Sequence, residues 1–281
     1  MKFKLIATCL MAALFSSAGA QQPSTVRIVA IGNSFTADAV EQYLYEIFAE
    51  KGYEAIIGNC YIGGCTLEKH WNKESSPDST VRNCNSYRKI VKGEKTTLGG
   101  KSIEHILRDE PWDYVVFQQG AGLYGKPESH HPYLENFKEY AKNFLEPGSY
   151  KTGYQLNWAF PKNCTNSRFS YYDNDQMKMY EACASCAKGL LEEGYVDFII
   201  PTGTSVQNGR GTSLEDTFNR DWGHLEYNYG RYTAALTWFE TITGIDATTV
   251  TWKPSTVTDE QAALCRAAVH AAVLRPYEAP Q

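Results

Sequence analysis

A serine near the start of the chain is the first residue that could carry out chemistry. Residues 26–31 read VRIVAI, a β-branched run typical of a strand buried on both faces of a parallel sheet, and Ser34 follows after Gly32 and Asn33. Ligands of such sheets bind at the carboxyl ends of the strands, and backbone N–H groups at the start of a following helix could stabilise an oxyanion there. Taken alone, however, such a serine is more often a helix cap or a turn residue.

A serine nucleophile also needs a base within hydrogen-bond reach and a third group that orients the base. The motif Asp221-Trp222-Gly223-His224 supplies both residue types just before a helical pattern near the C-terminus. Within one turn the two side chains can point toward the same strand ends, so that His224 would accept the serine proton and Asp221 would hold the imidazole ring. The motif alone is a weak signal, because an Asp before a helix is often a cap.

The alternation of apolar runs and helical patterns predicts the elements that would position these residues. Apolar runs predict five strands, at 26–31, 55–59, 114–117, 154–158 and 196–200. Helical spacing is found over 40–48 with Gly52 behind it, over 134–144, over 180–191, after His224, and in a last helix that starts with the capping-box pair Thr258 and Gln261. This alternation indicates βαβ units, and hence a parallel sheet with helices on both faces.

The length and composition of the chain fit one domain. At 281 residues with 43% hydrophobic content it can bury one sizeable core, so we expect a single domain over residues 21–281. The connection between residues 64 and 112 is unusually long and polar, and it includes the tract Ser75-Ser76-Pro77-Asp78-Ser79. We interpret it as a decorating insertion, either a lid or a small hairpin.

The first 20 residues have the pattern of a signal peptide. Lys2 and Lys4 precede an apolar run that ends at the small residues Ala18-Gly19-Ala20. We therefore expect an exported chain that starts at Gln21 and acts in the periplasm or outside the cell; the alternative is a lipoprotein acylated at Cys9. The remaining sequence has no apolar run close to the ~20 residues that a membrane span needs.

Charge and cysteine content limit the possible partners. The formal net charge is −5 and no long basic run is present, which argues against nucleic acid and favours a small or neutral substrate. After export, cysteines would remain where disulfides can persist, and their odd number leaves at least one unpaired; they stand at 60, 65, 84, 164, 183, 186 and 265. Cys183 and Cys186 form a CxxC, but their helical spacing favours core packing over a metal or redox site.

No histidine has a metal-ligand partner at a recognisable spacing, so we expect neither metal nor cofactor.

Taken together, the motifs resemble those of the SGNH/GDSL hydrolase superfamily, and more narrowly an exported bacterial group with a GNSFT first block (DUF4886-like). IVAIGNSFT resembles the first block, with Asn33 in place of the usual acid, and DWGH resembles the last. The second block, whose glycine N–H helps to form an oxyanion hole, resembles YIGGCTL, most plausibly at Gly64, with Gly63 as the alternative. The third block departs from the family pattern, because FQQGAG has no Asn where the family has one.

The resemblance implies a fold, an activity and a set of site residues. The implied fold is a three-layer α/β/α sandwich with a mostly parallel five-stranded sheet of flavodoxin-like order. The implied activity is that of a serine esterase without a cofactor, with Ser34, His224 and Asp221 as its triad. The backbone N–H groups of Ser34 and Gly64 would bind the oxyanion with help from the amide of Gln119, or of Gln118; the alternative is that both glutamines only tie down loops.

The substrate can be narrowed only by analogy. An exported esterase of this kind would remove acetyl or another short acyl group from carbohydrate, and we expect Trp222, Trp158 and His70 to line the cleft. The rival hypothesis from another class is a non-catalytic glycan-binding protein on the same fold. A flavodoxin-like nucleotide-binding protein is more distant, because the first loop has one glycine and no P-loop lysine.

Overall fold

The computed structural model describes residues 24–72 and 84–279. Its strands form one sheet with the order β4-β3-β2-β1-β5-β6-β7. The strands are β1 (Ser24–Gly32), β2 (Tyr53–Tyr61), β3 (Ser86–Val91), β4 (Glu94–Thr97), β5 (Tyr114–Phe117), β6 (Lys151–Gln155) and β7 (Phe198–Ile200). The predicted signal peptide, Cys9 and the tract from Ser75 to Ser79 lie outside the described residues.

Five of these strands make the parallel sheet that the sequence predicts. β1 pairs in parallel with β2 and with β5, and β6 and β7 continue the sheet in parallel beyond β5. Residues 28–31 of β1 are at most 1% exposed, as expected for a central strand with both faces covered. This arrangement brings the carboxyl ends of five strands to one edge of the sheet.

Two further strands make the sheet seven-stranded, which corrects the predicted count of five. β3 and β4 form an antiparallel hairpin that pairs with β2 at the outer edge of the sheet. The turn of this hairpin, Lys92-Gly93, has positive φ at both residues, as a two-residue type I′ turn requires. Because every residue of β4 is exposed, the hairpin lacks the apolar run that identified the other strands. The long polar connection therefore contains a hairpin, one of the two expected possibilities.

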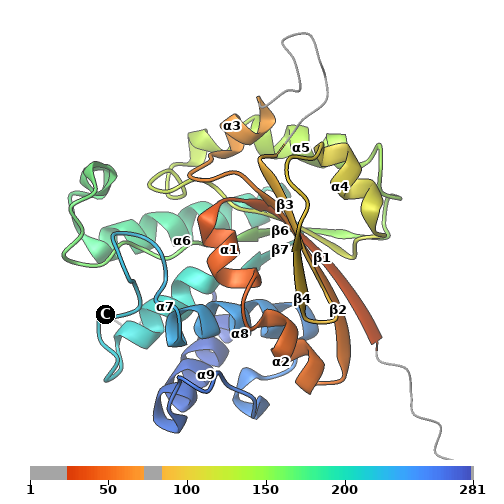
Figure 1. Ribbon diagram of the computed structural model, residues 1–281. Helices are drawn as coiled ribbons and strands as arrows, with labels where there is room; N and C mark the ends of the chain where they lie inside the picture. Colours follow the sequence, from red (N-terminus) through yellow and green to blue (C-terminus); the bar gives the residue numbers. More distant parts are fainter. Residues whose placement is uncertain (1–23, 73–83, 280–281) are drawn as a thin grey trace, which may run out of the picture.

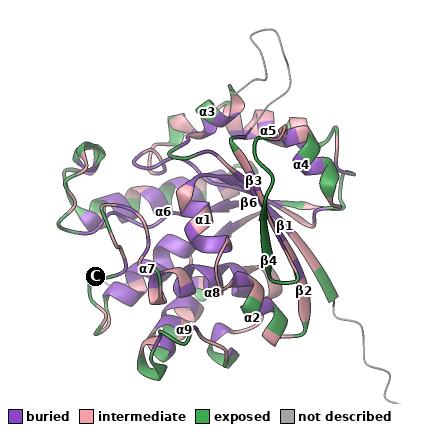
Figure 2. Cartoon of the chain, in the orientation of Figure 1, coloured by how far each residue is buried: buried purple, intermediate pink, exposed green. Residues whose placement is uncertain are grey.

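Helices cover both faces of the sheet and complete a three-layer α/β/α sandwich. Figure 1 shows α3, α4 and α5 on one side, and α1, α2, α8 and α9 on the other. The helices are α1 (Ser34–Val40), α2 (Leu44–Glu50), α3 (Leu67–Trp71), α4 (Ile103–Asp109), α5 (Tyr133–Ala141), α6 (Gln176–Glu192), α7 (Thr202–Arg210), α8 (Tyr229–Thr243) and α9 (Asp259–Leu274). In Figure 2 the buried residues are concentrated in the strands and on the inward faces of the helices. The predicted sandwich is confirmed.

Most of the helical patterns are also confirmed, with one interruption. α9 begins with the capping box formed by Thr258 and Gln261, and Gly52 follows α2 with φ 78°. The pattern over 40–48, however, is divided between α1 and α2, because Tyr43 adopts φ 72° and its hydroxyl donates to Tyr227 O at 3.0 Å. A tertiary contact thus accompanies a left-handed residue that apolar spacing alone could not reveal.

The cysteines pack as small apolar side chains in the described fold. Cys183 and Cys186 are both buried in α6, which confirms the core-packing interpretation of the CxxC. The described cysteines are all free thiols. Within the described residues, none of the helices combines the length and the apolar character that crossing a membrane requires.

Candidate active site

The turn between β1 and α1 is held by hydrogen bonds that fix the position of Ser34. Asn33, not Ser34, is the N-cap of α1: its Oδ1 accepts from Phe35 N at 2.9 Å, and its Nδ2 donates to Cys65 O at 2.8 Å. A Cβ on Gly32 would lie 2.6 Å from Cγ2 of Thr36, so the turn needs glycine for its close packing. Ser34 is the first helical residue, is partly exposed and is free to present its hydroxyl.

The three residues expected to form a triad meet at this edge of the sheet. The Oγ of Ser34 lies 2.8 Å from Nε2 of His224, and Nδ1 of His224 lies 2.8 Å from Oδ2 of Asp221. This is the chain of contacts in which a serine hydroxyl can pass its proton to an imidazole held by a carboxylate.

The carboxylate of Asp221 is fixed by backbone donors as well as by the imidazole. Its Oδ1 accepts from Gly223 N at 2.9 Å and from His224 N at 2.7 Å. Partial burial acts to raise the pKa of Asp221, but these hydrogen bonds and the one to the ring of His224 hold that pKa below its ordinary value. Asp221 therefore stays ionised at neutral pH and orients the ring.

A short bridge closes the segment that carries the Asp-x-x-His motif. Asn219 pairs with Leu225, and Arg220 N donates to His224 O at 3.0 Å. The buried side chain of Arg210 donates through Nη2 to Asn219 Oδ1 at 2.7 Å and forms an ion pair with Asp216. Burial lowers the pKa of Arg210 to about 10, which still leaves it charged at neutral pH. A buried cation thus supports the loop of the base.

Two of the three residues expected to contact substrate are structural, which corrects the prediction. Trp158 is 1% exposed, and its Nε1 donates to Gly223 O at 2.6 Å, so the indole supports the triad segment from beneath. The predicted strand over 154–158 ends as β6 at Gln155, which places Trp158 in the loop that follows. His70 is 0% exposed and its Nε2 lies 2.7 Å from Gly32 O, where it supports the turn of the nucleophile.

Trp222 is the aromatic residue of the three that reaches the surface beside the triad. It is partly exposed, and its ring centroid lies 5.8 Å from that of His224. Its other side packs edge-on against Phe160 at 5.4 Å. Trp222 also lines a shallow pocket together with Asp221. It therefore remains a candidate for substrate contact.

The side chain of Gln119 does not take the place of the third oxyanion donor, which corrects another prediction. Its Nε2 donates to Ser129 O at 2.7 Å and to Ser129 Oγ at 3.1 Å, and its Oε1 accepts from Leu67 N at 2.9 Å. Gln118 is equally buried: its Oε1 accepts from Asn33 N at 3.1 Å, and its Nε2 donates to Gln119 O. Both glutamines tie down loops at the strand ends, as the alternative interpretation held.

Gly64 is the residue from which the sequence predicts a second oxyanion donor. It is exposed, in the turn after β2, and has φ 60°. Ile62 N, at the start of that turn, donates to Gly32 O at 3.2 Å, so the turn is tied to the strand end that precedes Ser34. That the N–H group of Gly64 binds the oxyanion remains a prediction.

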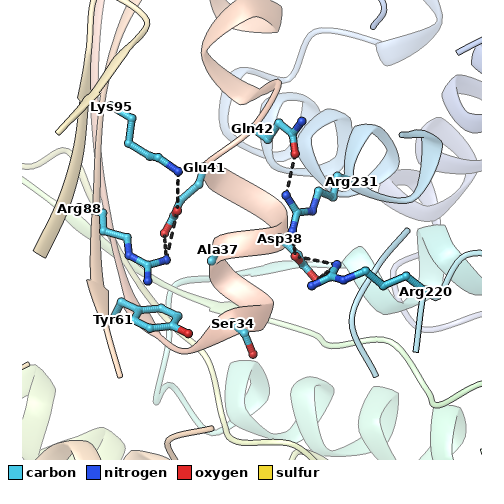
Figure 3. A pocket seen from close by; sticks show the side chains of 10 residues that line it. All are labelled: Ser34, Ala37, Asp38, Glu41, Gln42, Tyr61, Arg88, Lys95, Arg220 and Arg231. Atoms are coloured by element: carbon cyan, nitrogen blue, oxygen red, sulfur yellow. Dashed lines mark hydrogen bonds and ion pairs between the residues drawn. The ribbon is translucent and has the colours of Figure 1, made fainter. Parts of the chain in front are cut away.

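A polar pocket of about 360 Å³ opens beside Ser34. Its charged side chains surround α1, as Figure 3 shows. It is lined by Ser34, Ala37, Asp38, Glu41, Gln42, Tyr61, Arg88, Lys95, Arg220 and Arg231. Sequence reasoning missed Asp38 and Glu41; their signal was a polar stripe at helical spacing from the candidate nucleophile.

One group of side chains elsewhere could in principle hold a metal. Among the described residues, Glu240, Asp246 and His270 place ligand atoms within 4.8 Å of one another. Nδ1 of His270 lies 2.7 Å from Glu240 Oε1 and 3.3 Å from Asp246 Oδ1, so the three already satisfy one another as an ion-pair cluster between α8 and α9. None of the three lines the pocket that opens beside Ser34.

Known proteins with a similar sequence or structure were found for this chain. The family model described as a domain of unknown function, DUF4886, matches residues 27–272. The crystal structure of a DUF4886 family protein from Bacteroides uniformis is 36% identical, with 92% of this chain and 98% of that chain covered and a TM-score of 0.85. A candidate SGNH hydrolase from Slackia heliotrinireducens is 20% identical, with 78% of this chain and 100% of that chain covered and a TM-score of 0.50; this likeness shows the fold. No curated protein matches the chain.

Proposed function

The chain belongs to the DUF4886 family, and from that membership and the geometry of its site we propose that it is a serine esterase. The observation that carries the proposal is the continuous contact from Ser34 Oγ to His224 Nε2 and from His224 Nδ1 to Asp221, at 2.8 Å each. The contact lies at the carboxyl edge of a parallel sheet, beside an open pocket. The fold that the chain shares with the candidate SGNH hydrolase is compatible with this chemistry but does not by itself establish it.

In the first half of the proposed reaction, Ser34 becomes acylated. Its Oγ attacks the ester carbonyl while Nε2 of His224 accepts the hydroxyl proton, and the ionised Asp221 stabilises the imidazolium. The tetrahedral oxyanion collapses with cleavage of the bond to the alcohol oxygen. That oxygen takes the proton from His224, so the alcohol leaves neutral and the acyl group stays on Ser34.

In the second half, water removes the acyl group. His224 accepts a proton from the water as its oxygen attacks the acyl carbonyl, and it returns the proton to Ser34 Oγ when the ester bond breaks. We propose that the backbone N–H groups of Ser34 and Gly64 hold the oxyanion in both halves. The side-chain amide of Gln119 already donates to Ser129. The proposed oxyanion hole therefore uses the backbone N–H groups alone.

The finer assignment concerns compartment and substrate. We propose that residues 1–20 direct export and that the protein acts in the periplasm or outside the cell. The proposed ester is an acetyl or other short acyl group on carbohydrate; the partly exposed indole of Trp222 beside His224 supports this, since aromatic rings can stack on sugars. The contacts that occupy Gln118 and Gln119 with neighbouring loops are the observation that favours the rival, a glycan-binding protein without activity.

Hydrolysis of p-nitrophenyl acetate by the wild type and three variants tests the proposal. We expect Ser34→Ala and His224→Gln to lower kcat by at least about 10³-fold, since each removes a member of a unit that works together. The control is Ser170→Ala, an exposed serine on a 3-10 helix, which should leave kcat unchanged. Folded wild type without turnover would contradict the esterase proposal and make glycan binding the leading account.

A further inference from the structure

We propose that the pocket beside Ser34 receives a negatively charged group of the substrate, so that the preferred ester is anionic. The inference rests on the proposed esterase function for the statement that the ligand is an ester. That the ester is anionic follows from the charges of the pocket. Its lining has four cationic side chains and two carboxylates, a surplus of two positive charges.

The floor of the pocket is one face of α1. Ala37 and Asp38 follow Ser34 at intervals of three and four, which places them on the same face of α1; Glu41, the C-cap of the helix, and Gln42, just beyond it, continue the lining. A helix rises 1.5 Å per residue, so Glu41 lies about 10 Å along the axis from Ser34. A ligand whose carbonyl sits at Ser34 could therefore reach both charged walls with a group about 5–10 Å away.

The first wall comes from the β3–β4 hairpin. Arg88 Nη1 lies 2.9 Å from Glu41 Oε1, and Lys95 Nζ lies 3.3 Å from Glu41 Oε2. The guanidinium of Arg88 also stacks over Tyr61, 3.6 Å from the ring centroid. In the described chain, the hydrogen bonds of Arg88 use Nε and Nη1, so Nη2 is left for a ligand.

The second wall comes from the triad segment and α8. Asp38 accepts from Arg220 Nη1 at 3.2 Å and from Arg231 Nη2 at 2.5 Å. Both guanidinium groups lie over the ring of Tyr227, at 4.5 and 4.7 Å from its centroid. The hydrogen bonds that Arg220 makes with described residues use Nη1 on its side chain, so its Nη2 is likewise left for a ligand. Figure 3 shows these arginines approaching α1 from the side opposite Arg88 and Lys95.

The exposure of the charges decides which sign a ligand meets. The side chains of Asp38 and Glu41 are only 2% and 8% exposed, whereas those of the four cations are 18% to 48% exposed. The carboxylates therefore lie beneath the cations and hold them in place. Guanidinium groups held in this way suit an anionic oxygen ligand such as a carboxylate, to which the remaining Nη2 of Arg88 or of Arg220 can donate a charge-assisted hydrogen bond.

Binding to the Ser34→Ala protein tests the inference without turnover. For a charge on the alcohol side, the probes are 4-acetoxybenzoate and its methyl ester; for a charge on the acyl side, they are mono-p-nitrophenyl glutarate and p-nitrophenyl pentanoate. By calorimetry, we expect the anionic member of at least one pair to bind about tenfold more tightly than its neutral partner, which corresponds to ~1.4 kcal/mol. The side on which the preference is found identifies the source of the charge. Equal binding within both pairs would overturn the inference.

A charge variant and a salt series separate this pocket from nonspecific attraction. Lys95→Gln should lower the anionic preference about threefold, and raised salt should lower it further. The matched control is Lys92→Asn, in the turn of the same hairpin but outside the pocket, where Asn tolerates the positive φ; it should leave the preference unchanged. A preference that survives both Lys95→Gln and salt would contradict the assignment.

The outcome also distinguishes this inference from the esterase proposal. Wild type that hydrolyses esters while Ser34→Ala shows no anionic preference would leave the esterase standing and refute the charged pocket. An anionic preference in Ser34→Ala without turnover by wild type would leave the pocket standing and refute the esterase.

Discussion

At the scale of single residues, the site depends on a contact between side chains that lie 190 positions apart in the sequence. Ser34 and His224 meet at 2.8 Å because β1 ends in a capped turn and the segment of His224 is closed by its own bridge. Asp221 then sets the orientation of the imidazole ring through Nδ1. The serine, the base and the carboxylate form one unit, and each should be indispensable.

Replacing Asp221 by Asn tests whether its carboxylate orients the imidazole of His224, and it disturbs the surrounding structure little. Asp221→Asn keeps a side-chain oxygen for the backbone donors but puts an amide where the carboxylate stabilised the imidazolium. We expect kcat for p-nitrophenyl acetate to fall by about 10³ to 10⁴, the effect of a wrong ring tautomer in such triads. Because the side chain is 40% exposed, the free energy of unfolding should change little, by under about 1 kcal/mol. Retained kcat with normal folding would remove Asp221 from the triad.

Residue types could be predicted from the sequence, but the directions of several side chains could not. The serine and the Asp-x-x-His motif stand beside strand ends whose positions follow from apolar runs. Gln119 and Trp158 also follow strand ends, yet their side-chain N–H groups donate to Ser129 O, ten residues further on, and to Gly223 O, 65 residues further on, and neither residue lines the pocket. A sequence pattern says which edge a residue reaches, whereas its hydrogen-bond partners decide where it points.

At the scale of elements, Asp38 couples the helix of the nucleophile to the segment of the base. Besides Arg220 and Arg231, its carboxylate accepts from Leu225 N at 2.8 Å, one residue after His224. The side chain is 2% exposed, so the interaction is shielded from water. The position of His224 relative to α1 should therefore depend on the carboxylate of Asp38.

Asp38→Asn should lower both stability and turnover. Removing one partner from a buried ion cluster costs about 3–5 kcal/mol, and partial exposure of the two arginines reduces this to about 2–4 kcal/mol by urea denaturation. The control is Asp173→Asn, in an exposed ion pair with Lys178, where Asn tolerates the positive φ and the change should stay under about 0.5 kcal/mol. Equal effects of the two variants would contradict the coupling.

The cluster of His270 between α8 and α9 should give stability a specific pH dependence. The hydrogen bond with Glu240 raises the pKa of His270 in the folded protein. A raised folded pKa means that the stabilisation is complete below the unfolded value of about 6.5 and is lost as pH rises through the folded pKa. The difference in unfolding free energy between wild type and His270→Gln should therefore be larger at pH 5 than at pH 9. A difference that grows with pH would have the wrong sign.

Elements with strong apolar patterns were predictable, and those fixed by polar or tertiary contacts were not. The five parallel strands and the capping box of α9 follow from local signals. The β3–β4 hairpin is polar and its outer strand, β4, is exposed, and the break between α1 and α2 accompanies a contact of Tyr43 with Tyr227. This hairpin supplies one wall of the pocket, so the charge of the pocket was not visible in the sequence either.

At the scale of the whole molecule, the sandwich gathers distant segments at one edge. The carboxyl ends of the parallel strands bring together the turn of Ser34, the turn of Gly64 and the supporting loops of the glutamines, and the chain after β7 returns to place His224 opposite Ser34. The fold class could be predicted because alternating strands and helices admit few arrangements. The packing that selects each site residue becomes visible only in the assembled layers.

The most direct test of the central claim is the reaction of the folded protein with a fluorophosphonate, read by mass spectrometry of its peptides. A fluorophosphonate is attacked by an activated serine and leaves a stable adduct on the attacking oxygen. We predict a single adduct on Ser34 that is absent in Ser34→Ala and strongly reduced in His224→Gln. Folded wild type with no adduct, or with its adduct on another serine, would contradict the account.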